Sequence, residues 1–124
     1  PIVLQVPGAT AIAARGDQTC AATREGVYCW GAGVRSPRKI EGLEGAVEQL
    51  AVGADFVCAR QSGGVKCAGN NDSGQLGDGT TTTRAGARAV NGIQDAKAVM
   101  AGDGFACSLD ARSRVSCWGA NRGG

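Results

Sequence analysis

The apolar residues of the chain fall in short runs that return three times among polar and glycine-rich stretches. Each time, an apolar segment (residues 11–14, 50–52 and 99–101) precedes a corner rich in Gly or Asp. A strand with one cysteine, a tight turn and a second strand with one cysteine follow. Such short runs between turn residues are typical of β-strands. The pattern predicts an all-β chain with one small antiparallel sheet in each repeat.

The composition agrees with many short strands and a small core. The 124 residues are enough for one domain, but the chain has only two Phe, two Trp and one Tyr to fill its core. It has 21 Gly, and because Gly inside a helix or strand is destabilising, so many of them indicate a chain that turns often.

The six cysteines form three pairs of nearly constant spacing. If residues 24 and 25 make a two-residue turn, Cys20 and Cys29 face each other at a non-hydrogen-bonded position, where Cα atoms lie about 4.5 Å apart, within disulfide range. The same geometry applies with a turn at residues 62–63 and with a three-residue loop at residues 111–113. The predicted disulfides are Cys20–Cys29, Cys58–Cys67 and Cys107–Cys117.

Zinc binding and free thiols are the alternatives to disulfides. Structural zinc sites usually have cysteines only a few residues apart, and this chain has no His. We therefore expect three disulfides and an oxidising location: secreted, periplasmic or at the cell surface.

The repeats resemble a known family, the regulator of chromosome condensation repeats. Residues 69–80 read GNNDSGQLGDGT, which matches the family's most specific stretch, and the second cysteine strands end in Trp30-Gly31 and Trp118-Gly119. The resemblance covers nearly the whole chain and is strongest to a bacterial, exported, disulfide-containing branch. It implies blades of a β-propeller.

The chain departs from the family pattern at several positions. The corner His of the family is replaced by Gln18, Phe56 and Phe105, and Arg15 stands where the other repeats have Gly. Ala68 stands where the other repeats have Trp, which predicts a smaller plug between blades and a groove beside it. The first repeat also lacks the Gly-Gln-Leu-Gly segment.

We expect a single unit over residues 1–124, with repeats at about 9–45, 46–95 and 96–124, and with residues 1–8 completing a blade. Propellers typically have four to eight blades. Three blades are thus a partial propeller, and the ring must be completed by oligomerisation or by a longer chain. The total number of blades and the parent chain are not in the sequence.

Charge and motifs exclude several function classes. Thirteen basic and eleven acidic residues nearly cancel, and the basic ones form no cluster, which argues against nucleic acid and anionic membranes as partners. No apolar run is long enough to cross a bilayer. No nucleophile elbow or phosphate-binding loop occurs, so we expect no enzyme and no cofactor. Residues 70–79 superficially resemble a calcium loop but lack its terminal Glu, so we expect no metal site.

Surface recognition remains as the predicted function. Loops on a rigid frame often carry binding residues, and the corners carry Arg15, Asp17, Gln18, Asp55, Phe56, Asp103 and Phe105. Two readings of Phe56 and Phe105 are open: they point inward to fill the core, or they form a partner-facing patch.

We expect an exported, non-catalytic module that binds a protein through blade loops. The alternative is a structural component of an extracellular or envelope assembly that joins through its incomplete blade. Nucleotide exchange on a small GTPase, an activity that the family implies, is disfavoured because paired cysteines fit poorly with a reducing compartment.

Overall fold

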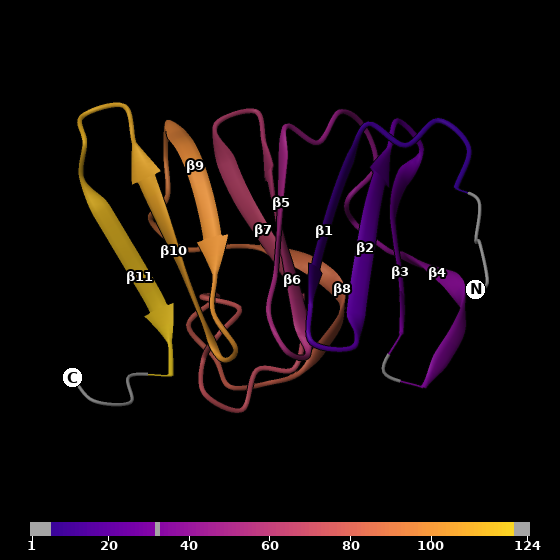
Figure 1. The fold of residues 1–124 in the computed structure, drawn as a ribbon. Coiled ribbons are helices and arrows are strands. Elements are labelled where there is room, and N and C mark those ends of the chain that lie inside the picture. The colour runs from indigo at the N-terminus through magenta and orange to yellow at the C-terminus, as the bar shows by residue number, and fades with distance from the viewer. Residues whose placement is uncertain (1–5, 32, 121–124) are drawn as a thin grey trace.

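The computed structural model describes residues 6–31 and 33–120, and these residues are all-β. Eleven strands form three antiparallel sheets of four, four and three strands. The sheets stand next to one another, from the N-terminal sheet on one side to the C-terminal sheet on the other (Figure 1). We call them blade 1, blade 2 and blade 3 in chain order. The expected all-β fold with three antiparallel blades is confirmed.

Blade 1 pairs neighbouring strands in chain order. Its strands are β1 (Ala11–Arg15), β2 (Gln18–Thr23), β3 (Gly26–Gly31) and β4 (Val34–Ile40). Thr23 pairs with Gly26, so the β2–β3 turn has two residues, as expected. The Thr23 hydroxyl donates to the Gly26 carbonyl and accepts from the Glu25 N–H, each at 3.1 Å, which ties both sides of the turn together.

Blade 2 has the same order and a much longer connection to its last strand. Its strands are β5 (Gln49–Val52), β6 (Phe56–Gln61), β7 (Gly64–Gly69) and β8 (Arg84–Ala89). Ser62 and Gly63 form the β6–β7 turn with φ of 50° and 79°, the backbone that a two-residue hairpin turn requires. Residues 70–83 connect β7 to β8, and we call them the long loop.

Blade 3 has three strands in the described residues: β9 (Ala96–Ala101), β10 (Phe105–Asp110) and β11 (Val115–Gly119). The Asp110 N–H donates to the Arg114 carbonyl at 3.0 Å. The β10–β11 turn therefore has the three residues expected, 111–113, and Ser113 adopts a φ of 65°, as the last residue of such loops often does.

All three expected disulfides are present. They join Cys20 to Cys29, Cys58 to Cys67 and Cys107 to Cys117, with Cα–Cα distances of 4.1, 4.1 and 4.0 Å. These short distances are typical of the non-hydrogen-bonded positions of an antiparallel pair, and they confirm the hairpin argument.

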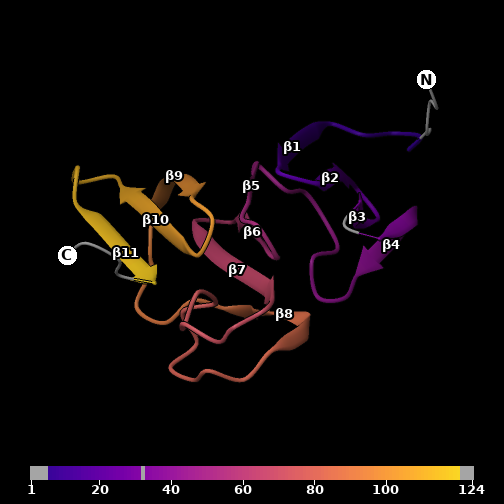
Figure 2. The same cartoon turned by 60° about the horizontal axis from the view of Figure 1, so that its bottom comes forward.

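The blades pack face to face, and each disulfide lies on the face that meets the following blade. We call that face the trailing face and the opposite one the leading face. Cys20 and Cys29 of blade 1 share a buried cluster with Leu50 and Val52 of β5. Cys58 and Cys67 of blade 2 likewise share a cluster with Val99 and Ala106 of blade 3. Strands β1, β5 and β9 lie along one side of the resulting fan (Figure 2).

The long loop is organised around one buried amide. The Asn71 side chain is fully buried, its Nδ2 donates to the carbonyls of Thr80 and Thr82 at 3.0 Å each, and its Oδ1 accepts from the Leu76 N–H at 2.9 Å. Asp78 accepts hydrogen bonds from Thr80, Asn71 and Arg84. These bonds, that of the Thr80 hydroxyl first, lower the pKa of Asp78 to about 2. The acid and amide groups of this loop are thus used to hold its shape.

Two expectations fall partly outside the described residues. Residues 1–5 and 121–124 are not described, so the completion of a blade by residues 1–8 stays a prediction, as do the repeat boundaries. The described residues contain no helix long and apolar enough to cross a membrane.

Candidate functional site

Four loops gather at one end of the blades, which we call the corner end. They are the loops between the first two strands of each blade (residues 16–17, 53–55 and 102–104) and the long loop, and they lie at the bottom in Figure 1. The hairpin turns at residues 24–25, 62–63 and 111–113 lie at the opposite end. All seven expected partner-binding residues belong to the corner end.

Arg15 connects all three blades at this end. It is the last residue of β1, and its Nε donates to the Val52 carbonyl of blade 2 at 3.1 Å. Its Nη2 donates to the Ala101 carbonyl of blade 3 at 2.8 Å, and its Nη1 lies 3.5 Å from the Asp103 carboxylate. Its donors are therefore largely used within the fold.

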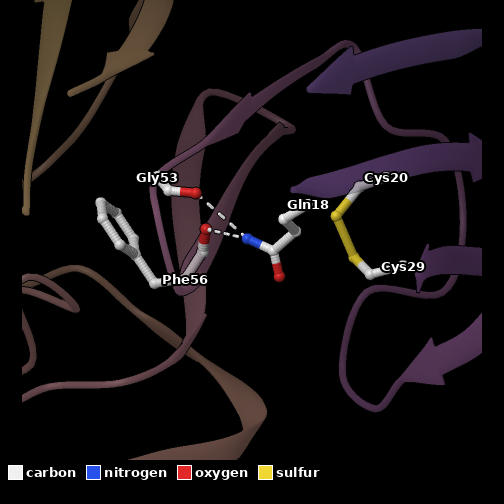
Figure 3. The surroundings of a disulfide bond; sticks show 5 residues. All are labelled: Gln18, Cys20, Cys29, Gly53 and Phe56. Atoms are coloured by element: carbon white, nitrogen blue, oxygen red, sulfur yellow. Dashed lines mark hydrogen bonds between the residues drawn. A yellow bond between two sulfur atoms is a disulfide. The ribbon is translucent and has the colours of Figure 1, made fainter. Parts of the chain in front are cut away.

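Gln18 also bonds across a blade boundary (Figure 3). Its Nε2 donates to the carbonyls of Gly53 and Phe56 at 3.1 and 3.2 Å. These two carbonyls belong to the corner of blade 2, so the amide of Gln18 holds blade 1 against blade 2. Asp17 beside it is exposed.

The two corner phenylalanines have different surroundings. Phe56 is 1 % exposed, whereas Phe105 is 42 % exposed. Phe56 packs against blade 3, which follows blade 2. Within the described residues, no blade follows blade 3 to cover Phe105. The inward reading holds for Phe56, and its place among the expected partner-binding residues is wrong because the ring is buried.

Each of these rings lies over a glycine. A Cβ atom on Gly53 would lie 1.9 Å from the Phe56 ring, and one on Gly102 would lie 2.2 Å from the Phe105 ring. Blade 1 has Gln18 in place of the ring, which leaves room for Arg15 at the glycine position. Arg15 and Gln18, which replace the Gly and the Phe of the other repeats, therefore belong to a single change in the packing of this corner.

A groove of about 980 Å³ opens at the corner end and is lined by residues of blade 2 and blade 3. Three carboxylates line it, those of Asp55, Asp72 and Asp103, and no Lys or Arg is among the lining residues that the structure describes. The rings of Phe105 and Trp118 add apolar surface. The Asp103 side chain is 83 % exposed, and the Asp55 carboxylate accepts a hydrogen bond from Asn70 at 2.6 Å. The groove is acidic and partly aromatic.

The groove brings together only part of the expected set. Asp55, Asp103 and Phe105 line it, whereas Arg15, Asp17 and Gln18 do not. Sequence reasoning missed the contributions of Asn70 and Asp72. These residues lie in the segment 69–80 that was singled out for its repeat pattern, so the pattern marked the segment but not the side chains that reach the groove.

The groove expected beside Ala68 is not open. Ala68 is 2 % exposed and lies in the core between blades 1 and 2. Its counterpart Trp118 lies against the long loop of blade 2, where a Cβ on Gly77 would come within 2.9 Å of the indole Cδ1. The smaller side chain at position 68 is therefore buried between blades 1 and 2.

Comparison with known proteins places the fold. No model of a protein family matches the sequence. The human E3 ubiquitin-protein ligase HERC2 is 40 % identical over 92 residues, which cover 62 % of this chain and 2 % of HERC2. Among solved structures, yeast RCC1 (Prp20), solved bound to Kap60, has a TM-score of 0.74 at 23 % identity. Human WBSCR16 has a TM-score of 0.76 at 24 % identity.

The structural matches cover almost all of this chain but a smaller share of the other proteins. They span 92 % and 93 % of this chain, and 30 % and 34 % of yeast RCC1 and WBSCR16. The chain therefore corresponds to about a third of each of these two structures and to a small part of HERC2.

The three disulfide-bonded sheets pack face to face in chain order. They are consecutive blades of a β-propeller. The chain is similar to proteins with regulator of chromosome condensation repeats, in sequence to part of HERC2 and in fold to part of yeast RCC1.

Proposed function

We propose that this chain is an exported, non-catalytic module that binds a protein partner through the loops of its corner end. The observation that carries the proposal is the groove lined by blades 2 and 3, which combines three carboxylates with the exposed ring of Phe105 and has no basic side chain among the described residues of its lining. Loops on a rigid sheet frame are a common place for recognition.

The chemistry of the groove indicates the kind of partner segment. Carboxylates without a basic neighbour attract Lys or Arg, and a half-exposed aromatic ring offers an apolar or cation–π contact. A protein loop with a basic side chain next to an apolar one fits both features. Asp103 already has Arg15 at 3.5 Å, so Asp55 and Asp72 are the carboxylates with most to gain from a basic partner.

The disulfides support export. Three intramolecular disulfides suit an oxidising compartment. Proteins of similar fold bind proteins: yeast RCC1 was solved with Kap60, and Prp20p was characterised for binding to Gsp1p and histones. Nucleotide exchange on a small GTPase stays disfavoured for this chain because its disulfides would be reduced in a nuclear or cytosolic setting.

A random peptide library displayed on phage tests the proposal. The wild-type chain should enrich peptides with Lys or Arg beside an apolar residue. Asp55→Asn combined with Asp72→Asn should reduce that enrichment at least tenfold, because both substitutions keep the shape of the side chain and remove its negative charge from the groove. A matched control, Glu25→Gln with Glu44→Gln, removes two exposed carboxylates away from the groove and should have no effect. Failure to enrich basic peptides, or equal loss in the control, would contradict the proposal.

A further inference from the structure

The connection between blade 2 and blade 3 contains an asparagine that is followed by a glycine. This connection consists of residues 90–95, between β8 and β9, and the pair is Asn91-Gly92. Both residues are exposed and lie in a turn, and Gly92 adopts a φ of 75°, in the left-handed region that favours glycine. Apart from its chain neighbours, no described residue lies within 4 Å of the position that a Cβ atom on Gly92 would occupy. The space beside this peptide group is therefore open.

The fold holds the start of this turn but not its reactive groups. The Val90 N–H donates to the Val65 carbonyl at 2.8 Å, and the Asn91 N–H donates to the Gly77 carbonyl at 2.9 Å. Among the described residues, neither the Asn91 side-chain amide nor the Gly92 N–H takes part in a hydrogen bond. No hydrogen bond within this part of the chain therefore opposes rotation of the Asn91 side chain or of the peptide group that follows it.

The other described asparagines have bonded side chains. Asn71 is fully buried, and both its Nδ2 and its Oδ1 form hydrogen bonds within the long loop. Asn70 donates to the Asp55 carboxylate at 2.6 Å and accepts from the Asp72 N–H at 2.9 Å. Neither of them is followed by glycine. Among the described asparagines, Asn91 alone is exposed, has an unbonded amide and precedes a glycine.

We propose that Asn91 is a deamidation site, at which the folded chain converts asparagine to aspartate and isoaspartate. The Gly92 nitrogen loses its proton and attacks the Asn91 Cγ, and the side-chain amide group leaves as ammonia, so that a five-membered succinimide ring closes. Glycine favours this step because it has no Cβ to crowd the attacking nitrogen. Water then opens the ring. Cleavage between the ring nitrogen and Cγ gives aspartate, and cleavage between the nitrogen and the backbone carbonyl carbon gives isoaspartate.

The reaction changes the charge and the backbone of the connection. Each event replaces a neutral amide by a carboxylate, which lowers the formal net charge of +2 by one. Isoaspartate also adds one carbon atom to the main chain between Asn91 and Gly92. The added atom follows the Asn91 N–H, so the change falls on residues 92–95, which lead to β9. Neither Asn91 nor Gly92 lines the corner-end groove, so this inference does not rest on the proposed function.

Peptide mapping of the folded chain during incubation in mildly alkaline buffer tests the proposal. The peptide with Asn91 should become acidic first and should contain both aspartate and isoaspartate, which reversed-phase chromatography separates. The peptide with Asn70 and Asn71 is the internal control and should react more slowly.

Two variants test the chemistry of the pair. Asn91→Gln should largely abolish the acidic form of the intact chain, because its longer side chain would have to close a six-membered ring. Gly92→Asp should slow the reaction at Asn91 severalfold, because Asp tolerates the left-handed region and places a Cβ beside the attacking nitrogen. Intact disulfides and an unchanged circular dichroism spectrum show that each variant folds.

A reduced sample unfolded in urea shows what the fold contributes. Asn70 and Asn71 should deamidate faster there than in the folded chain, because their hydrogen bonds are lost, whereas Asn91 should be the fastest described site in both samples. Reaction of Asn91 in the unfolded sample alone would overturn the proposal, since the folded turn would then prevent ring closure. So would a folded chain in which Asn70 or Asn71 reacts first, or a product at position 91 that is aspartate only, which indicates direct hydrolysis without the ring.

Discussion

Substitution of Gly53 by Ala tests the packing of the corner most sharply. The new Cβ would lie 1.9 Å from the Phe56 ring, far inside contact distance, and the buried ring has nowhere to move. Overpacking of this kind costs about 1–3 kcal/mol, and we expect the upper part of that range. The backbone of Gly53 is not in the left-handed region. Ala therefore stabilises the folded chain by up to about 1 kcal/mol, because it lowers the conformational entropy of the unfolded chain. The net loss of unfolding free energy should be about 2 kcal/mol.

Gly102→Ala is the matched control. Its Cβ would lie 2.2 Å from the Phe105 ring, but this ring is half-exposed and can move outward. The unfolding free energy should change by less than about 0.5 kcal/mol, because the entropic gain offsets what strain remains.

Urea unfolding with intact disulfides, followed by circular dichroism, measures both variants. A loss of about 2 kcal/mol lowers the midpoint by about 1 M urea for a domain of this size. Gly53→Ala in a Phe56→Leu background should cost less than in the wild type, because the smaller side chain vacates part of the space. Equal losses for Gly53→Ala and Gly102→Ala would refute the reasoning that burial of the ring decides the cost.

Three further predictions follow from single contacts. Arg15→Ala should lower the unfolding free energy by about 1 kcal/mol, because the hydrogen bonds to the Val52 and Ala101 carbonyls are lost. Asp103→Asn should change the unfolding free energy by less than about 0.5 kcal/mol, because the Arg15–Asp103 ion pair is exposed. The urea midpoints of the two variants test this difference. Because the pKa of Asp78 is low, the ionised side chain contributes fully to stability above the ordinary pKa near 3.8, and this contribution is lost as the pH falls towards 2. The melting temperature of Asp78→Asn should therefore fall less steeply between pH 5 and pH 2 than that of the wild type. An unchanged slope would contradict this prediction. Replacement of both Cys58 and Cys67 by Ala should lower the unfolding free energy by about 3 kcal/mol, as loss of a crosslink over about ten residues predicts, and an unchanged urea midpoint would contradict that value.

The hairpins were predictable because their determinants are local. The spacing of Cys20 and Cys29 and the turn residues between them decide which residues face each other, and this depends only on strand geometry. The same holds for the three-residue turn before Val115. The strand pattern therefore led to the correct sheets and disulfides.

The surface of the corner end was less predictable because it depends on neighbouring blades. Phe56 and Phe105 each stand three residues after a glycine, yet one is buried and the other is open. No local pattern distinguishes them, because blade 3 covers Phe56 whereas no blade follows Phe105 within the described residues. The hydrogen bonds of Arg15 to the Val52 and Ala101 carbonyls also could not be predicted from the spacing of residues, because these partners are 37 and 86 residues away.

The measurement that tests the central claim most directly is peptide mapping of the native chain after alkylation without reduction. If the chain consists of three similar blades, each closed by its own hairpin disulfide, no cysteine is alkylated. The crosslinked peptides then join only Cys20 with Cys29, Cys58 with Cys67, and Cys107 with Cys117. Alkylated cysteines, or any crosslink between residues of different blades, would contradict that account.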